Sequence, residues 1–355
     1  MHSDKCSFIH SLPTNTDLDV IGDVHGEWEA LQQLLHFLGY DESGQHKQGR
    51  KLVFIGDLCD RGPDSPAVLD WVIKAVAAEN AFAVIGNHEL NLLIEDPKDG
   101  SGWYFDNRPQ DEARFAPWQH YCNAKRKQLQ DTLSQWPLIL QRDDLRIVHA
   151  AWLPDSIDKL LHCGETSLVK QYHYWENRFF EDFRQTEWYE HYMQERQQLD
   201  AELENEHYPM TFQPGIAHYD LLRSCHNPLR ALTSGIQAIT QKPFYINGRW
   251  RFTVRKPWWQ QYNDPIAVII GHYWRSWYST GVAEHRKELF QEPPTHWLGK
   301  RQQVFCIDFS IGARWRERKK AISSADSQMH LAALRWPENL IMLNNGKYHL
   351  SKRSH

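Results

Sequence analysis

The chain has 355 residues, of which 41% are hydrophobic and 24% are charged, and its formal net charge at pH 7 is -5. This composition is ordinary for a globular protein with a buried core. The chain has no dense block of Lys and Arg and no run of about 18 apolar residues, so neither a nucleic-acid partner nor a membrane span is expected.

The first 90 residues predict an alternation of strands and helices. Three short apolar runs have the length of strands, and each runs into a glycine turn: 17–21, 51–55 and 81–85. Two stretches between them have helical character: 27–38 and 65–79. This order is typical of parallel βαβ units, in which ligands bind beyond the carboxyl ends of the strands. The three turns are therefore expected to meet at one crevice.

The later chain has a different pattern. A hairpin is predicted over 138–148, with Asp143 and Asp144 at its turn. Aromatic side chains at three- and four-residue steps predict a helix over 165–208, with this aromatic stripe packed on the body of the protein. Further strands are predicted at 267–270, 304–307, 330–334 and 339–343.

Charge is unevenly distributed along the chain. Residues 165–207 contain eleven acidic and four basic residues, a net charge of -7, so the remainder is slightly basic. The basic run 314–320 is expected to be a solvated loop. If the acidic segment lay over the crevice, it would disfavour highly anionic substrates, because like charges repel.

Five blocks of glycine and polar residues lie at the ends of predicted strands: GDVHG (22–26), GDLCDRG (56–62), GNHE (86–89), VHA (148–150) and GH (271–272). Alone, each has an ordinary structural interpretation, since Asp23 could cap a helix and His149 could be a buried histidine. Together they supply carboxylate, imidazole and amide groups, the mixed donor set that binds Mn, Fe or Zn. The combination predicts a metal centre.

In this order, the blocks resemble those of the calcineurin-like metallophosphoesterases, in the bacterial type of the branch that holds the phosphoprotein phosphatases and the diadenosine tetraphosphatases. The resemblance covers 17–95, 145–150, 266–273 and 304–343. It implies an α/β fold, a two-sheet β-sandwich flanked by helices, over residues 15–350. The segment 152–265 would be a largely helical, aromatic-rich insertion within this domain.

The resemblance also implies roles for the site residues. Two metal ions, Mn, Fe or Zn, would be held by six side chains: Asp23 and His25 on the first ion, Asn87, His149 and His272 on the second, and Asp57 bridging both. His88 would protonate the leaving oxygen, and Asp60 would orient His88. Arg61 and Asn87 would contact the phosphate. The family usually has glycine after the histidine of the fourth block, where this chain has Ala150 and Ala151.

A further phosphate-binding arginine is implied by the same resemblance, but no motif locates it. The candidates between the fourth and fifth blocks are Arg223, Arg230, Arg249 and Arg255. Arg255, shortly before the pair Trp258 and Trp259, is preferred. Arg275, three residues beyond His272, is a second candidate for substrate binding.

We therefore expect a metal-dependent phosphatase that hydrolyses phosphate monoesters, on a protein side chain or a small aryl or alkyl phosphate, by direct attack of a metal-bound hydroxide. An alternative substrate is a dinucleoside polyphosphate such as diadenosine tetraphosphate. A non-catalytic phosphate-binding scaffold is a third interpretation, but it requires a lost ligand or acid, and none is lost. Six scattered cysteines and the lack of an apolar leader favour a cytoplasmic location.

Overall fold

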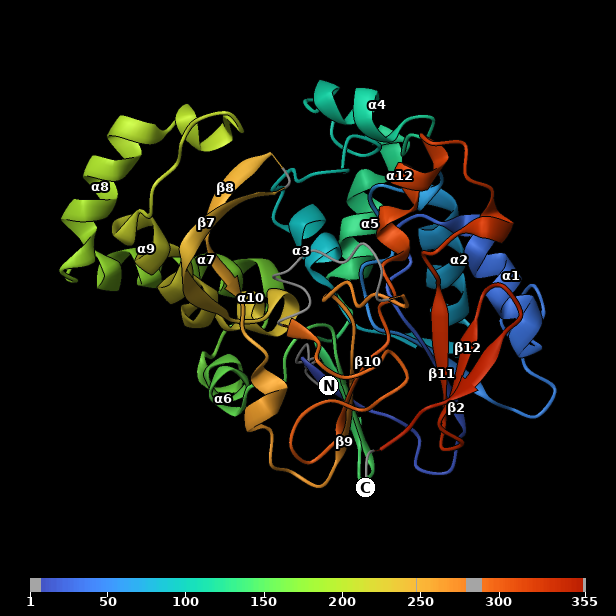
Figure 1. Ribbon diagram of the computed structural model, residues 1–355. Coiled ribbons are helices and arrows are strands. Elements are labelled where there is room, and N and C mark those ends of the chain that lie inside the picture. Colours follow the sequence, from blue (N-terminus) through green and yellow to red (C-terminus); the bar gives the residue numbers. More distant parts are fainter. Residues whose placement is uncertain (1–7, 247, 279–288, 354–355) are drawn as a thin grey trace. The chain divides into compact units, whose positions relative to one another are not determined.

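The computed structural model describes residues 8–246, 248–278 and 289–353. The chain divides into two compact units. The first combines the chain up to Ala150 with the chain from Trp259 onward, and the second is Ala151–Trp258 (Figure 1). The second unit overlaps the predicted insertion 152–265, whereas the last residues of that range belong to the first unit.

Two β-sheets form the centre of the first unit. Their strand orders are β13-β12-β11-β2-β3-β4 and β1-β5-β6-β9-β10. The strands are β1 Ile9–Ser11, β2 Leu18–Ile21, β3 Lys51–Phe54, β4 Ala81–Ala83, β5 Ile139–Arg142, β6 Leu145–Val148, β9 Ala267–Ile270, β10 Val304–Cys306, β11 Ala332–Trp336, β12 Leu340–Leu343 and β13 Tyr348–Leu350. Two sheets flanked by helices confirm the predicted fold class.

Strand directions confirm the expected βαβ units. Strands β2, β3 and β4 are parallel, with Val20 beside Val53 and Val53 beside Phe82. Strand β11 closes the other side of β2 in the antiparallel direction. The predicted hairpin is the antiparallel pair β5 and β6, and β6 in turn lies parallel to β9. One buried apolar core contains side chains of both sheets, among them Val20, Val53, Ile147, Ile269 and Leu334.

Helices of the first unit follow from amphipathic patterns and local caps. They are α1 Trp28–Leu38, α2 Ser65–Ala77, α3 Asn87–Leu93, α4 Pro109–Phe115, α5 Arg126–Leu133 and α12 Arg314–Arg318, with the 3₁₀ turns η1 Asn123–Lys125, η4 Ile311–Ala313 and η5 Ser324–Asp326. Helix α1 buries Leu31 and Leu34 completely, and burial of each leucine contributes roughly 1.5–3 kcal/mol. The Asp64 side chain caps α2 by accepting from the Ala67 amide.

The second unit contains five helices and a hairpin among its described residues. They are α6 Pro154–His162, α7 Leu168–Phe183, α8 Trp188–Leu199, α9 Pro214–His226, α10 Pro228–Ser234, η2 Glu202–Glu204, β7 Gln237–Ile246 and β8 Arg249–Arg255, and η3 Trp258–Gln261 begins at its last residue. No helix in the described part of the chain has the length and hydropathy to cross a membrane.

The prediction of one helix over 165–208 is wrong, because the chain breaks between α7 and α8. The Thr186 hydroxyl donates to the Phe183 carbonyl at this break, a local bond that competes with helix continuation. The predicted aromatic stripe packs inside the unit, where the Phe183 ring lies 5.3 Å from the Tyr219 ring on α9.

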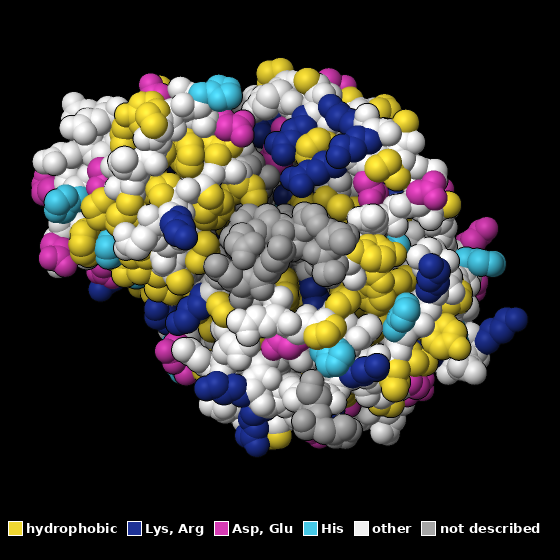
Figure 2. Space-filling view, in the orientation of Figure 1, with side chains coloured by type: hydrophobic (Ala, Val, Ile, Leu, Met, Phe, Trp, Pro, Cys, Tyr) yellow, Lys and Arg dark blue, Asp and Glu magenta, His cyan; other side chains and the backbone are white. Residues whose placement is uncertain are grey.

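The prediction of a solvated loop at 314–320 is also wrong. Helix α12 forms there, and Arg314 and Glu317 are buried. The buried carboxylate of Glu27 makes this possible, because it accepts from Arg318 at 2.5 Å and lies 3.8 Å from Arg314. Figure 2 shows Lys and Arg side chains gathered over the region where Figure 1 draws α4 and α12.

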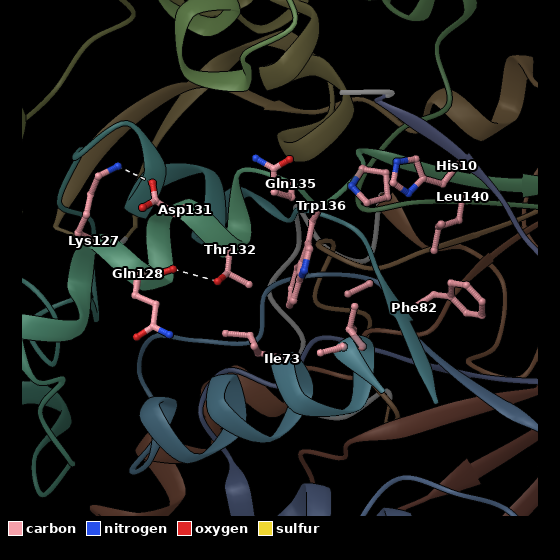
Figure 3. Close-up of a pocket in the computed structure, with 14 residues that line it drawn as sticks. His10, Ile73, Phe82, Lys127, Gln128, Asp131, Thr132, Gln135, Trp136 and Leu140 are labelled. Carbon is pink, nitrogen blue, oxygen red and sulfur yellow. Dashed lines mark hydrogen bonds and ion pairs between the residues drawn. The ribbon is translucent and has the colours of Figure 1, made fainter. Parts of the chain in front are cut away.

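A cavity of about 790 Å³ lies in the first unit between α2, β4, α5 and β5 (Figure 3). Phe82, Trp136 and Leu140 contribute apolar walls, and Lys127 and Asp131 form an ion pair at its side. None of the residues predicted to bind metal or substrate lines this cavity. The predicted chemistry is therefore located elsewhere in the same unit.

Candidate metal centre

The six predicted ligands all follow strands of the first unit. Asp23 and His25 come after β2, Asp57 after β3, Asn87 after β4, His149 after β6 and His272 after β9. Because β2, β3 and β4 are parallel, as are β6 and β9, their carboxyl ends deliver these side chains to common edges of the two sheets. Five of the six side chains are buried, and Asn87 is partly exposed.

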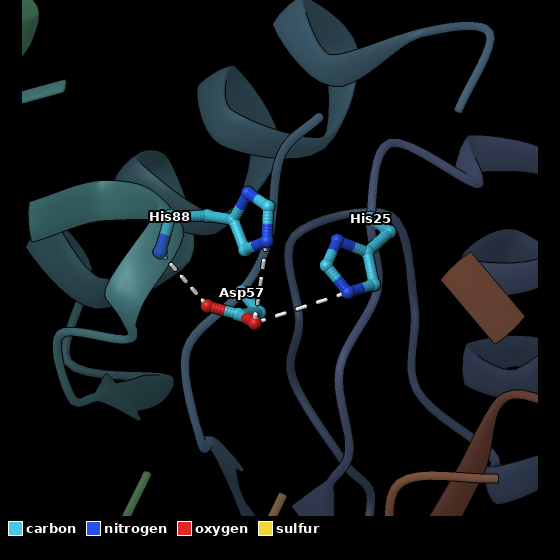
Figure 4. A group of neighbouring side chains, drawn as sticks. All are labelled: His25, Asp57 and His88. Carbon is cyan, nitrogen blue, oxygen red and sulfur yellow. Dashed lines mark hydrogen bonds and ion pairs between the residues drawn. The ribbon is translucent and has the colours of Figure 1, made fainter. Parts of the chain in front are cut away.

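Asp57 lies at the centre of the cluster. Its Oδ2 atom is 3.8 Å from His25 Nε2 and 3.2 Å from His149 Nε2. Figure 4 shows the Asp57 carboxylate directed toward His25 on one side and toward His88 on the other. Two ligand atoms bound at about 2.1 Å to one ion are about 3.0–3.4 Å apart, so these spacings are close to those of a bridging carboxylate.

The ligand atoms fall into two groups that share Asp57. In one group, the atoms of His25, Asp57 and His88 lie within 4.8 Å of one another, and Asp23 Oδ2 is 3.9 Å from His25 Nε2. The other group contains Asp57, His149 and His272 within the same limit. Asn87 Oδ1 completes it, at 2.8 Å from His272 Nδ1. The donor set therefore fits a pair of metal ions.

Electrostatics in the cluster favour a bound cation. Burial, with the nearby charge of Asp308, raises the pKa of Asp23 well above its usual range. Burial also opposes ionisation of Asp57, but the charges of His149 and His88 hold the pKa of Asp57 well below its usual range. Against the effect of burial, Asp57 raises the pKa of His149 to about 10. The ionised form of Asp57 is thus favoured at the centre of the cluster, where a carboxylate could hold a metal ion.

Backbone strain is concentrated in the same loops. Positive φ angles occur at five site residues that are not glycine: His25 (48°), Asp57 (52°), Asp60 (75°), Arg61 (70°) and His272 (67°). Each such conformation costs about 1–3 kcal/mol and persists only where its surroundings enforce it. Glu89 supplies part of that support, because its carboxylate accepts from the amides of Asp57 at 2.8 Å, Leu58 at 2.7 Å and Gly86 at 3.0 Å.

Two glycines leave room for the ligands. A Cβ atom on Gly271 would lie 2.1 Å from Asp23 Oδ1, and one on Gly312 would lie 2.2 Å from the His25 ring. Asp308 fixes the loops on which these glycines stand, accepting from the Trp274 amide at 2.6 Å and from the Ser310 amide at 2.8 Å. Asp308 and Gly312 belong to the closing segment that the resemblance covers, but the sequence analysis gave them no role.

His88 has the partner that the resemblance implies. Its Nδ1 atom makes a short hydrogen bond with Asp60 Oδ2. The other oxygen of Asp60 accepts from the indole Nε1 of Trp103 at 2.5 Å. His88 Nε2 is left facing the cluster, 3.8 Å from Asp57 Oδ2. Trp103 thus holds Asp60 in place, a contact that the sequence did not reveal because no motif covers 95–140.

The predicted arginines have different surroundings. Arg61 faces the cluster, with Nη1 3.1 Å from His25 Nε2 and its guanidinium 4.9 Å from the Trp274 ring. Arg275 is directed into the interior instead. Its side chain is 1% exposed, and Nη2 donates to the carbonyls of Pro293 and His296. Enclosed in this way, Arg275 is not available to a substrate phosphate at the rim, which corrects its predicted role.

Arg255 lies on β8, in the second unit. Its assignment as a phosphate ligand stays a prediction.

Comparison with known proteins places the motifs in one family. The model of the calcineurin-like phosphoesterases matches residues 17–276. An asymmetrical bis(5'-nucleosyl)-tetraphosphatase of Oceanobacillus iheyensis is 47% identical over 74 residues, which are 20% of this chain and 30% of that protein. A symmetrical bis(5'-nucleosyl)-tetraphosphatase of Chromobacterium violaceum is 33% identical over 147 residues, which are 41% of this chain and 47% of that protein.

The chain thus spans less than half the length of either curated relative. Among solved structures, a cold-active protein-tyrosine phosphatase of a psychrophilic Shewanella species has 15% sequence identity and a TM-score of 0.47. That comparison covers 99% of this chain and 85% of the Shewanella chain.

Proposed function

Because the chain belongs to the calcineurin-like phosphoesterases, which are metal-dependent phosphoric ester hydrolases, we propose that it is a dinuclear-metal phosphatase that hydrolyses phosphate monoesters by direct attack of water. The substrate would be a phosphorylated protein side chain or a small aryl or alkyl phosphate. The observation that carries this proposal is the Asp57 carboxylate shared by two groups of ligand atoms, with His88 beside it.

The two ions, when bound, supply an activated water and neutralise charge on the phosphoryl oxygens. Asp23 and His25 would hold one ion, Asn87, His149 and His272 the other, and Asp57 both. Arg61 would hold the phosphoryl oxygens, since a guanidinium can donate two parallel hydrogen bonds to them. These residues bind and orient the group that reacts.

His88 would protonate the leaving oxygen. Its Nδ1 atom is occupied by Asp60, so Nε2 is the atom that can donate a proton into the site. Asp60 keeps the imidazole in this orientation, and Trp103 holds Asp60. Cys59 is not placed as a nucleophile, because it is fully buried with Sγ 3.6 Å from the Glu89 carboxylate. No phosphoenzyme is therefore required.

A second candidate function is hydrolysis of a dinucleoside polyphosphate. It is favoured by the names of the two curated relatives, both bis(5'-nucleosyl)-tetraphosphatases. The two candidates share the metal centre and differ only in what lies beyond the scissile phosphoryl group.

The deciding experiment is an assay of the Mn²⁺-loaded protein on phosphotyrosine and phosphoserine peptides, diadenosine tetraphosphate and a phosphodiester. We expect the highest kcat/KM on a monophosphate, and no activity in the presence of a chelator. With methanol added, direct attack by water yields inorganic phosphate alone, whereas a phosphoenzyme would also yield methyl phosphate. A clear preference for diadenosine tetraphosphate would establish the second candidate, and turnover of none of the four would refute both.

A further inference from the structure

Three arginines of the first unit form a basic surface beside the metal-ligand cluster. We call Arg61, Arg114 and Arg316 the arginine rim. Arg316 is exposed, and Arg61 and Arg114 are partly buried, so all three can reach a bound molecule. They come from three distant parts of the chain, the loop after β3, helix α4 and helix α12.

Trp315 joins the two outer arginines. The guanidinium of Arg114 lies 4.7 Å from the centre of the Trp315 ring, and that of Arg316 lies 5.3 Å from it. Such contacts hold a guanidinium over an aromatic face, while the N–H groups at its edge can still donate hydrogen bonds. Figure 2 shows Lys and Arg side chains, with hydrophobic ones among them, gathered over α4 and α12.

The rim is continuous with the cluster. At the inner end, Arg61 contacts His25, and Gly312 packs on the same imidazole two residues before α12 begins. Gly100 packs on the Arg61 side chain, and the neighbouring Asp99 accepts from Arg114 at 2.5 Å. The same short segments that border the cluster therefore carry the outer arginines.

The partners of its basic neighbours, in α12 and directly after it, distinguish them from Arg316. Arg314 and Arg318 share the carboxylate of Glu27, and Lys319 donates to the carbonyl of Ala113. Within the part of the chain that the structure describes, neither Arg61 nor Arg316 has a carboxylate within ion-pair distance. Arg61 and Arg316 thus have no direct carboxylate partner among the described residues, and the charge of Asp99, the partner of Arg114, also acts on Arg316.

The rim arginines also interact through their charges. Desolvation, together with the charges of Arg114 and Arg61, lowers the pKa of Arg316. Like charges held this close repel, and the repulsion is relieved when an anion binds between them. A phosphoryl group suits this position, because its oxygens accept several charge-assisted hydrogen bonds at once.

We propose that Arg316 and Arg114, held around Trp315, form a second anion subsite for a phosphoryl group attached to the one that Arg61 and the metal centre bind. This inference rests on the proposed function of the metal centre. A simple monophosphate contacts only the inner end of the rim. A substrate with contiguous phosphoryl groups contacts the whole rim, so the subsite lowers the KM of condensed phosphates and leaves the KM of simple monophosphates unchanged.

The test compares Arg316→Ala with Lys320→Ala, which removes the same charge from an exposed position just beyond α12. Each protein is assayed on inorganic tripolyphosphate and on 4-nitrophenyl phosphate, with Mn²⁺ in excess over both. We expect Arg316→Ala to lower kcat/KM on tripolyphosphate by about 10- to 100-fold, mainly through KM, since a hydrogen bond to a charged group is lost. On 4-nitrophenyl phosphate the change stays within about twofold. Arg316→Lys recovers part of the loss.

Equal losses on the two substrates, or equal losses in the two variants, overturn the subsite while leaving the metal centre intact. Failure of the wild-type protein to hydrolyse either compound refutes the proposed function instead. In that case calorimetry measures the Kd of tripolyphosphate for the wild-type protein and for Arg316→Ala. Equal Kd values in the two proteins overturn the subsite. A loss seen only on an acidic phosphopeptide would assign the rim to a peptide carboxylate and refute the second phosphoryl group.

Discussion

The two units differ in how they use their side chains. In the first, short buried strands end in loops whose polar residues converge on one cluster, at the cost of positive φ angles. In the second, apolar and aromatic side chains pack on one another, as in the cluster of Leu203, Met210, Ile216, Ala217 and Phe252 and in the contact of Phe183 with Tyr219. The proposed ligands are thus concentrated where parallel strands fix the positions of their ends.

The two units also differ in charge. The acidic stretch 165–207 lies entirely in the second unit, whereas the arginine rim lies in the first. An acidic cover would disfavour polyanionic substrates, and the rim would favour them. A preference for monophosphates would therefore indicate that the acidic stretch influences substrate binding, and a preference for polyphosphates would indicate that the arginine rim does.

The largest difference is expected when one carboxylate is neutralised in each unit. Asp57→Asn weakens both groups of metal ligands, so we expect loss of bound metal and a fall in kcat of more than about 10³-fold. Asp200→Asn makes the same chemical change on the second unit, where Asp200 pairs with Arg196 at the surface. Asp200→Asn should leave the metal content and kcat unchanged. Metal analysis and steady-state kinetics decide, and a fully loaded, active Asp57→Asn protein would refute the site.

The next comparison uses two histidine–aspartate pairs. His88→Ala removes the proton donor and should lower kcat on an alkyl phosphate by about 10²–10⁴-fold, with most metal retained. The loss should be smaller on an aryl phosphate, whose leaving group needs less protonation. His226, paired with Asp182 at 2.9 Å in the second unit, is the control, and His226→Ala should have no such effect. Equal losses of His88→Ala on both substrates would exclude the acid role.

A smaller effect is expected from an indole hydrogen bond. Trp103→Phe removes the donor to Asp60 and should lower kcat by about 10- to 100-fold, because Asp60 no longer holds His88 in place. As for His88→Ala, the fall in kcat should be larger on an alkyl phosphate than on an aryl phosphate. Trp250→Phe removes a similar bond, from Nε1 to the Asn205 carbonyl at 2.8 Å, in the second unit. A loss independent of the leaving group would show that Trp103 has only a structural role.

The smallest effect on the metal centre is expected from a core change in the second unit. Phe252 is fully buried there, and Phe252→Ala should destabilise that unit by about 3–5 kcal/mol. Metal content should stay unchanged, because all six proposed ligands belong to the first unit. Phe180→Ala, at an exposed position of the same unit, is the matched control. Hydrogen exchange locates the destabilisation, and loss of metal in Phe252→Ala alone would show that the two units depend on each other.

Sequence analysis located the proposed ligands because each stands within a few residues of a strand end, where the chain direction fixes the side chain. It could not find Trp103, whose contact with Asp60 spans 43 residues without a motif. The helix α12 was missed because its arginines are neutralised by Glu27, which lies 291 residues earlier than Arg318. Arg275 was misassigned because spacing from His272 does not determine where a long side chain points.

The hairpin of β7 and β8 was also missed. Every residue of β7 is partly or fully exposed, so its sequence lacks the alternation that marks a half-buried strand. When a strand is stabilised by hydrogen bonds to its neighbour and not by burial of one face, the alternation of apolar and polar residues does not predict it. The described architecture of the first unit was therefore far more predictable than that of the second.

We expect Asp57 to join two metal ions in one site. Electron paramagnetic resonance of the protein titrated with Mn²⁺ tests it directly, since two manganese ions bridged by a carboxylate are magnetically coupled. In the wild-type protein we expect two ions per chain and the multiline spectrum of a coupled pair. In Asp57→Asn we expect the signal of an isolated ion or no bound manganese. Saturation at one ion per chain, or two uncoupled six-line signals in the wild-type protein, would contradict it.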